Sequence, residues 1–178
     1  MAIAKRKKRF FDVDMPLLKK ETQLQAYELK ELGGRLIIYD LTRLLKGKSL
    51  IIKLKVKVEG DKAPSVPKEI KLLPYHIRRM MRKGTNSVED SFSAECKDAK
   101  IRIKPFLITR RKVSRAIRKA LREKAKEEIL DYVKDKSYEK IFDDVLKNSL
   151  QKTLSIKLKK IYPLSLCEIR ILTVEKEF

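Results

Sequence analysis

Between Lys100 and Lys134 the chain reads KIRIKPFLITRRKVSRAIRKALREKAKEEILDYVK, and its hydrophobic pattern changes partway along. As far as Thr109 the apolar residues are closely spaced and several are β-branched, which is typical of a strand. From Val113 onward Gly and Pro are absent, and Ala, Leu, Lys, Arg and Glu dominate, which predicts a long helix that ends at Lys134. This stretch therefore joins a region of strands to a region of helices.

The residues before this stretch predict mainly strands. The segment 87–96 precedes a three-residue turn, so we expect it to pair with residues 100–109 as a hairpin. The segment 50–60 alternates apolar residues with lysines, which predicts a strand with one buried face. Further predictions are strands at residues 11–15, 24–30, 35–39 (well buried) and 68–73, a turn at 33–34, a loop at 62–67, and short helices at 41–45 and 74–84.

The residues after this stretch predict more helices and one strand. Ser137 is a candidate N-cap for a helix toward Leu150, and a third helical segment runs to Lys160 before Pro163 ends it. Residues 164–175 then form a strand. Strands first, helices second and one returning strand define an α+β fold. By composition the chain divides into a basic arm at 1–9, a β-rich domain at 10–112 and a helical α/β portion at 113–178.

The charge of the chain indicates a polyanionic partner. Of 178 residues, 45 are Lys or Arg and 24 are Asp or Glu, giving a net charge of +21, while 43% apolar residues suffice for a core. The positive charge is concentrated in the first two thirds, since residues 1–60, 61–120 and 121–178 carry +8, +11 and +2. Nucleic acid is the first candidate partner, and an anionic membrane surface is the second.

Sequence signals for secretion and membrane insertion are missing. No apolar run approaches the roughly 18 residues of a membrane span, and no apolar segment follows the basic N-terminus as a secretory signal requires. Cys96 and Cys167 are far apart and suggest no disulfide framework, which fits a reducing cytosol. We therefore expect a cytoplasmic protein without a membrane partner.

Basic residues form clusters that are candidate phosphate-binding sites. Residues 5–9 are five cations in a row, and such a run is a solvated tail, a localisation signal or an arm for a polyanion. From Arg110 to Arg122 there are seven cations and no acid, whereas a solvated helix face usually mixes both signs. The candidate RNA-binding residues are Lys5, Arg6, Lys7, Lys8, Arg9, Arg78, Arg79, Arg82, Arg110, Arg111, Lys112, Arg115, Arg118, Lys119 and Arg122.

The predicted long helix separates its cations from its apolar residues. At about 100° per residue, one face holds cations and the opposite face is apolar. The basic face contains Arg111, Arg115, Arg118, Lys119 and Arg122, and the apolar face contains Val113, Ala116, Ile117, Ala120 and Leu121. No aromatic cluster resembles a base-stacking signature, so the sequence favours recognition of the nucleic-acid backbone.

The sequence predicts no catalytic residue, no metal ligand and no cofactor. No segment has the strand–loop–helix spacing of a glycine-rich phosphate loop. The weak candidates for metal binding are the set His76, Cys96 and Cys167 and the pairs Asp12–Asp14 and Asp143–Asp144. The set lacks ligand spacing, and neither pair comes with a base and a third ligand for Mg²⁺. An enzyme of nucleic-acid processing therefore ranks third among the functions considered.

Four short segments resemble one protein family in the same order and spacing. They are FFDVDMP at Phe10–Pro16, GRLII followed by DLTRL within residues 34–44, ITRR at residues 108–111, and IYPL at residues 161–164. This set resembles the archaeal and eukaryotic family of small-subunit ribosomal proteins called S-three-a-e, also known as e-type protein S-one. The eukaryotic members are longer at both ends, so the resemblance favours an archaeal member.

The resemblance implies a structural, non-enzymatic role in the ribosome. It implies a barrel-like antiparallel sheet at the N-terminus and then the helical portion, bound to small-subunit ribosomal RNA on the platform near the messenger exit. The expected partners are that RNA and neighbouring small-subunit proteins, with messenger RNA as a further candidate. Lys5 to Arg9 would lie along RNA phosphate, with Phe10 and Phe11 fastening the arm to the folded body. The alternative is a free-standing RNA- or DNA-binding protein of the chaperone or chromatin type.

Overall fold

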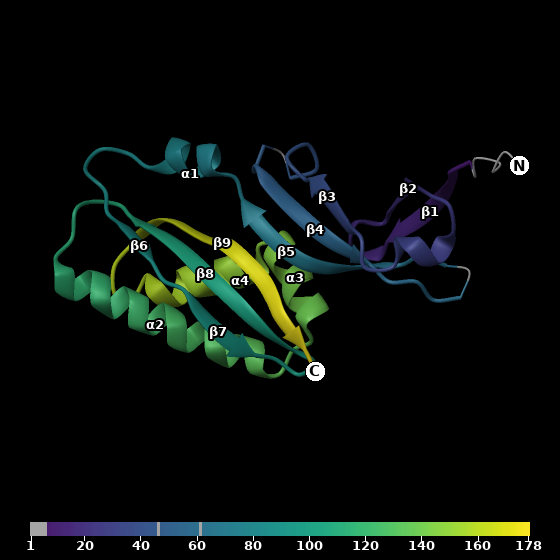
Figure 1. The fold of residues 1–178 in the computed structure, drawn as a ribbon. Helices are drawn as coiled ribbons and strands as arrows, with labels where there is room; N and C mark the ends of the chain where they lie inside the picture. Colours follow the sequence, from purple (N-terminus) through teal and green to yellow (C-terminus); the bar gives the residue numbers. More distant parts are fainter. Residues whose placement is uncertain (1–6, 46, 61) are drawn as a thin grey trace, which may run out of the picture. The chain divides into compact units, whose positions relative to one another are not determined.

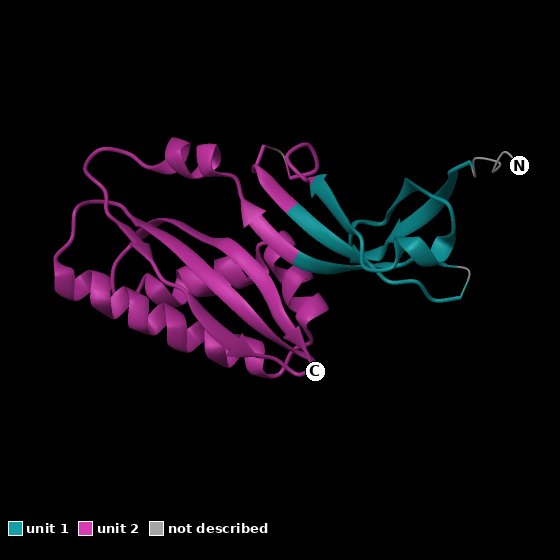
Figure 2. Ribbon diagram, viewed as in Figure 1, with its two compact units in different colours: residues 1–39, 52–68 teal, residues 40–51, 69–178 magenta. Residues whose placement is uncertain are grey.

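The computed structural model describes residues 7–45, 47–60 and 62–178. Its strands and helices, drawn in Figure 1, confirm the α+β class. Contacts divide the chain into two compact units (Figure 2): unit 1 comprises Met1–Tyr39 and Ile52–Lys68, and unit 2 comprises Asp40–Ile51 and Glu69–Phe178. The division into residues 1–9, 10–112 and 113–178 describes composition, and it stays a prediction.

The strands of unit 1 form two groups. They are β1 (Arg9–Met15), β2 (Lys20–Ala26), β3 (Leu36–Asp40), β4 (Leu50–Val56) and β5 (Ser65–Leu72), of which the last three extend into unit 2. β1 and β2 pair antiparallel across the 3-10 turn η1 (Pro16–Leu18), and the left-handed backbone of Lys19 (φ 52°) reverses the chain there. β3, β4 and β5 are neighbours in that order.

Hydrogen bonds also connect these two groups of strands, which belong to separate sheets. The N–H of Asp14 donates to Ala63 O (3.1 Å), and Ser65 Oγ donates to Asp14 O (2.9 Å), which joins β1 to the start of β5. On the other side, Arg35 beside β3 donates from Nη1 to Gln25 O of β2 (2.9 Å). The predicted antiparallel pairing of strands at the N-terminus is confirmed, and its barrel-like closure stays a prediction.

The interior of unit 1 holds apolar side chains from its strands. Every second residue of β4 is buried, because a strand turns alternate side chains to opposite faces. The side chains that are at most 1% exposed are Val13, Met15, Ala26, Leu32, Ile52, Leu54 and Val56.

Unit 2 is built on an antiparallel sheet with the strand order β5-β9-β8-β6, and β7 also pairs with β8. Its further strands are β6 (Ser87–Glu89), β7 (Phe92–Glu95), β8 (Ala99–Thr109) and β9 (Leu164–Glu177). β8 and β9 pair over the whole of β8, from Ala99 opposite Glu177 to Thr109 opposite Leu164. The predicted hairpin of β7 with β8 and the returning C-terminal strand are both confirmed.

Three helices between β8 and β9 pack against this sheet (Figure 1). They are α2 (Arg115–Lys134), α3 (Tyr138–Leu146) and α4 (Ser149–Leu158). α2 begins where Ser114 Oγ accepts the N–H of Ile117 at 3.4 Å, so the hydroxyl caps the helix. Its buried residues recur at every fourth position: Leu121, Ala125, Ile129 and Val133.

Several predicted strand boundaries are wrong. The strand predicted at 24–30 ends at Ala26, and Leu29–Leu32 forms the 3-10 turn η2 instead. The strand predicted at 50–60 ends at Val56. The loop predicted at 62–67 contains the start of β5, and Pro67 lies within that strand. The strand predicted at 87–96 is two strands, because Asp90 Oδ1 accepts the N–H of Ser91 (2.8 Å) in a local turn that interrupts pairing.

The two short predicted helices are also corrected. Residues 41–45 form a turn, in which Asp40 Oδ1 accepts the N–H of Thr42 (2.8 Å) and Leu45 N–H donates to Leu41 O. The hydrogen bonds from Thr42 lower the pKa of Asp40. Gly47 then takes a left-handed conformation (φ 91°), which ends any helical path. The helix predicted at 74–84 exists but is shorter, as α1 (Pro74–Met80).

β3 is less buried than its sequence predicts. Leu36 and Ile38 are 57% and 65% exposed, and Ile37 is the buried residue of this strand. One face of β3 turns toward the buried interior of unit 1, so alternate side chains must point outward whatever their polarity. Apolar density alone therefore overstated the burial of this strand.

α1 buries His76, the only histidine of the chain. His76 Nδ1 lies 3.4 Å from the N–H nitrogen of Ser49 and 3.3 Å from Arg79 Nη2. Both neighbours are donors, so Nδ1 accepts and the neutral ring carries its proton on Nε2. Among the described residues Nε2 is buried without a hydrogen-bond partner. Burial first, and then the charge of Arg79, hold the pKa of His76 below its usual 6.5.

We expect Leu121→Ala to lower the free energy of unfolding by about 2–5 kcal/mol, because truncating a fully buried leucine leaves a cavity. Ile117→Ala is the matched control and should cost less, since Ile117 is half-buried. Urea unfolding followed by circular dichroism measures both losses. Equal losses would show that the first turns of α2 are packed as tightly as its middle.

We expect the melting temperature to fall as the pH drops below 6.5. The unfolded chain binds a proton at His76 more readily than the folded chain does, so protonation favours unfolding. The contribution of the neutral ring is complete above 6.5 and is lost as the pH falls toward the lowered folded-state pKa. His76→Gln should flatten the profile between about pH 7 and pH 5. If both proteins lose the same number of degrees over this range, His76 is not the group responsible.

Candidate nucleic-acid interface

The segment that leads into α2 is held by polar contacts at the end of β8. Thr109 is buried, and its N–H donates to Asn86 O (2.9 Å) while its Oγ1 donates to Arg111 O (2.7 Å). Asn86 Oδ1 in turn accepts the N–H of Val113 (2.8 Å). The backbone of residues 109–113 is therefore fixed. The three predicted binding residues in this segment are all exposed: Arg110, Arg111 and Lys112.

The first turns of α2 bring four cations around one surface hollow, which we call the basic hollow. It has a volume of about 260 Å³ and is lined by Arg115, Arg118, Lys119 and Arg122 together with Ser87 at the start of β6. Arg118 and Lys119 lie three and four residues after Arg115, and Arg122 lies four and three residues after them, which places the four cations on one side of a helix. Four of the predicted binding residues are thus brought together.

Acidic side chains leave most of this charge in place. Lys119 Nζ lies 3.7 Å from Glu123, and both side chains are strongly exposed, so this pair contributes little. Among the described residues, Arg115, Arg118 and Arg122 form no ion pair, and the buried Nε of Arg118 has no hydrogen-bond partner. The basic hollow therefore combines positive charge with donors that the protein does not use.

The second half of α2 is different, because its own acids neutralise its lysines. Lys124 Nζ lies 2.9 Å from Glu127 and 3.3 Å from Glu128, and Glu128 also pairs with Lys157 of α4. The hydrogen bond from Lys157 is the main cause that lowers the pKa of Glu128. Acids are therefore interspersed with the lysines in this half of the helix, whereas residues 110–122 contain none.

Three positions of α2 lie differently from the predicted faces. Ala116 and Ile117 were expected on a buried face, but Ala116 is exposed and Ile117 is half-buried. Arg118 was expected to point outward and is half-buried. The reason is that the buried stripe of α2 begins only at Leu121. The spacing of apolar residues predicts which side of the helix is apolar. The packing of the neighbouring strands decides at which residue that side becomes buried.

The arginines of α1 have two different environments. Arg78, Arg79 and Arg82 are all exposed, and Arg82 follows the end of the helix. Arg79 Nη2 lies 3.5 Å from Gly47 O and 3.3 Å from the ring of His76, so this guanidinium helps to hold α1 in place. Arg78 and Arg82 are also exposed, but their guanidinium groups make no such contact with the described residues. None of the three lines the basic hollow.

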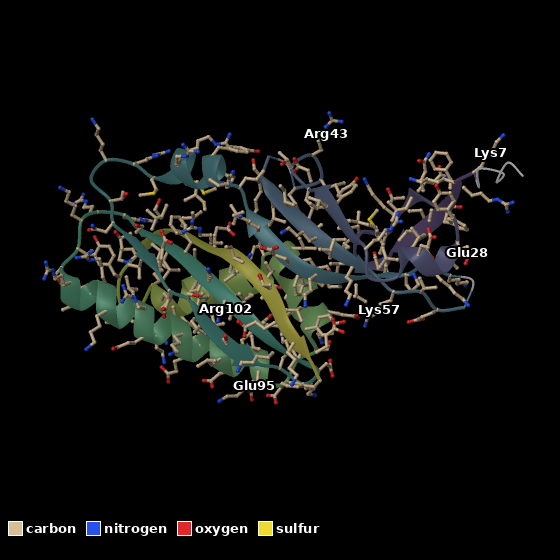
Figure 3. The ribbon with its side chains drawn as sticks, in the orientation of Figure 1. Lys7, Glu28, Arg43, Lys57, Glu95 and Arg102 are labelled. Carbon is tan, nitrogen blue, oxygen red and sulfur yellow. The ribbon has the colours of Figure 1, made fainter. Side chains whose placement is uncertain are left out.

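The basic arm is described only in part. Lys5 and Arg6 lie outside the described residues. Lys7, Lys8 and Arg9 are exposed, and Figure 3 shows Lys7 beside the N-terminal end of β1 with its side chain directed away from the ribbon. Arg9 is already the first residue of β1. The predicted arm therefore overlaps the fold by one residue.

Phe10 lies on the outward face of the β1–β2 hairpin. It is 64% exposed, so the prediction that it fastens the arm to the body is wrong, whereas Phe11 is half-buried on the same face as Val13. Tyr27 is 42% exposed, and Lys8 Nζ lies 5.6 Å from the centre of its ring. Sequence reasoning missed this aromatic group, and only the pairing register of β1 with β2 could have revealed it.

The described residues contain no cluster of metal ligands and no membrane-spanning helix. In this part of the chain no group of three or more His, Cys, Asp or Glu side chains could hold a metal ion. No helix of the described residues is long and apolar enough to cross a membrane. Cys96 and Cys167 are buried and unpaired, and burial raises the pKa of Cys167 to about 12. The thiol of Cys167 therefore stays protonated at neutral pH.

Comparison with known proteins gives two matches. The model of the ribosomal S3Ae family matches residues 4–177. The small ribosomal subunit protein eS1 of Nanoarchaeum equitans (strain Kin4-M) is 28% identical over 167 residues, which cover 89% of this chain and 84% of that protein. The family match spans both the hairpin and the basic hollow, and it confirms the resemblance that the four sequence segments indicate. The chain belongs to the ribosomal S3Ae family.

Proposed function

We propose that this chain is a structural constituent of the small ribosomal subunit that binds ribosomal RNA through the basic hollow and the basic arm. Family membership and the name of the archaeal relative support the ribosomal role and a structural rather than a catalytic one. The finer proposal is a position on the platform near the messenger exit in the cytoplasmic ribosome. Neighbouring small-subunit proteins and messenger RNA are its further proposed partners.

The observation that best supports RNA binding is the positive charge of the basic hollow, which nearby acids leave largely unneutralised. Like charges four residues apart on a helix repel, and an RNA phosphate between them would relieve that repulsion. Three of the four cations are arginines, whose planar guanidinium matches phosphate oxygens with two hydrogen bonds. Arg118 also lines the hollow, and its buried Nε has no hydrogen-bond partner among the described residues.

The polar contacts around Thr109 support the same proposal. They fix the backbone from which Arg110 to Lys112 leave, so these side chains reach solvent from a rigid base. A rigid base lowers the entropy lost when a ligand is bound. The cations of this segment and of the basic hollow follow one another along the chain, which suits an RNA backbone with its regularly spaced charges.

A free-standing RNA- or DNA-binding protein is the alternative, because the same cations could hold any nucleic acid. The family match favours the ribosome. Sedimentation of a cell lysate separates the two, since a ribosomal constituent should stay with the small subunit through a moderately high-salt wash. Release into the top fractions, together with co-purifying RNA of random length, would favour the free-standing protein.

We expect the triple substitution Arg115→Gln, Lys119→Gln and Arg122→Gln to weaken RNA binding while leaving the melting temperature almost unchanged. The three side chains are exposed, and glutamine keeps helix propensity. Affinity for a structured ribosomal RNA fragment, measured against salt, should lose about 0.7–0.9 units of log–log slope for each phosphate contact removed. Arg118 is kept, because its half-buried side chain would mix a stability effect with the binding effect.

The matched control is Lys152→Gln, Lys159→Gln and Lys160→Gln, which removes the same charge from exposed positions in and just after α4. Its effect on affinity should be clearly smaller. If both triple variants weaken binding equally, only net charge matters and the basic hollow is no specific site. If the α2 variant melts early while its affinity holds, the hollow serves the fold.

We expect removal of residues 1–7 to leave the fold intact and to weaken incorporation into the small subunit. β1 begins at Arg9, and Lys8 keeps its contact with Tyr27, so the cut spares the hairpin. Circular dichroism and melting report the fold, and sedimentation with reconstituted subunits reports incorporation. A full-length control with Lys5, Arg6 and Lys7 changed to Gln should weaken incorporation similarly. Unfolding of the truncated chain would contradict the proposed role of the arm.

A further inference from the structure

The outer face of the β1–β2 hairpin carries four side chains that we call the aromatic patch: Lys8, Phe10, Gln25 and Tyr27. Phe10 and Tyr27 are 64% and 42% exposed, and Lys8 and Gln25 are exposed as well. All four belong to unit 1. Large aromatic rings are usually buried to a greater extent, because their removal from water is favourable. Two exposed rings beside a basic segment therefore indicate a surface that binds a ligand.

The strand register places these four side chains together. Phe10 lies opposite Gln25, and Lys8 and Tyr27 lie just beyond the last pair of the hairpin, Arg9 with Ala26. The distance of 5.6 Å between Lys8 Nζ and the centre of the Tyr27 ring agrees with this placement. Phe10 and Tyr27 then form a diagonal pair, for which separations of about 7–8 Å are usual. The two rings are close enough to serve neighbouring groups of one ligand.

The aromatic patch does not serve the core of unit 1. The opposite face of β1 supplies that core through Val13 and Met15. A second cation borders the patch, because Arg35 Nη1 donates to the backbone oxygen of Gln25 at 2.9 Å. Lys8 is thus next to the Tyr27 ring, and the Arg35 guanidinium is next to the backbone of Gln25. An apolar partner would gain nothing from these charges, whereas a ligand with flat rings and phosphates would use both features.

We infer that unpaired bases of RNA stack on Phe10 and Tyr27 while Lys8 and Arg35 hold the adjoining phosphates. The inference rests on the proposed function, because it takes RNA as the partner. Proteins that hold single strands combine a cationic track with aromatic rings on which bases stack. The Gln25 side-chain amide can both donate to and accept from the edge of a stacked base. Every base has a flat face that can stack on a ring, but in a duplex neighbouring base pairs cover these faces. The patch therefore distinguishes unpaired from paired RNA.

The basic hollow and the aromatic patch therefore differ in the RNA that they accept. The hollow contacts phosphates, which both paired and unpaired strands present. The patch needs exposed base faces, which a continuous duplex hides between its neighbours. Binding of a fully paired RNA should depend on the hollow alone, and binding of an unpaired strand should depend on both.

The first experiment changes the rings and keeps their apolar character. In the full chain, Phe10→Leu with Tyr27→Leu should reduce affinity for a fluorescent oligouridine of about 12 nucleotides by roughly 5- to 150-fold per stacked base lost. Affinity for an RNA duplex of the same length and the salt slope should stay unchanged. Phe178→Leu is the control, because Phe178 is 71% exposed and lies in unit 2. Circular dichroism verifies that each variant is folded.

The outcomes separate this inference from the proposed function. Unchanged oligouridine binding by the leucine variant overturns the inference, and an apolar surface for a protein partner would then explain the exposed rings. Oligouridine binding that is lost in the leucine variant supports it. If the parent protein binds the duplex and not the oligouridine, the inference fails and the proposed function stands. If the parent protein binds neither RNA, both fail.

A fluorescence reporter tests the contact directly. The chain contains no tryptophan, so Phe10→Trp introduces a single indole at the patch and keeps a flat ring there. Stacking with a base should quench its emission when oligouridine is added, and the duplex should leave the emission unchanged. Unchanged emission at saturating oligouridine would show that the strand binds elsewhere.

Discussion

The antiparallel pairing of β8 with β9 is the interaction on which the rest of unit 2 depends. It joins residues 99–109 to residues 164–177, so everything between them must leave the sheet and return. The three intervening helices make that return while packing against the sheet. At the end of β8, Thr109 and Asn86 then set the backbone direction into α2. The position of the basic hollow is therefore a consequence of strand pairing.

The arginines of α2 all lie in its first half, and most of its buried residues lie in its second half. The second half of α2 buries Ala125, Ile129 and Val133 and neutralises its lysines with Glu127 and Glu128. The first half keeps its cations without acids, at the cost of repulsion between neighbours. A net charge of +21 adds a long-range repulsion that an apolar core must outweigh until a polyanion is bound. The same helix thus contributes to stability at one end and to recognition at the other.

Strong periodicity made much of the fold predictable, and tertiary contacts explain most of the rest. α2 and β9 were predictable because each pattern continues over many residues, and the β7–β8 hairpin was predictable from the short turn between its strands. Leu36 and Ile38 look like core residues, but their exposure depends on which face β3 turns to the interior of unit 1. The grouping of the cations on α2 follows from helical spacing. The half-burial of Arg118, the role of Ser87 in the hollow and the outward position of Phe10 depend on neighbouring strands that one sequence does not specify.

The place of β9 in the sheet has a consequence for the order in which the protein is made. A ribosome releases a chain from its N-terminal end, so β5 and β8 emerge before the strand that lies between them. Their inner edges stay without a partner until residues 164–177 arrive, because β9 pairs with both. Pairings that span so many residues form slowly, whereas α2 can form from local contacts as soon as it emerges. During synthesis the chain therefore presents its cationic helix while two strand edges are still open, and a chaperone that covers those edges would protect it from aggregation.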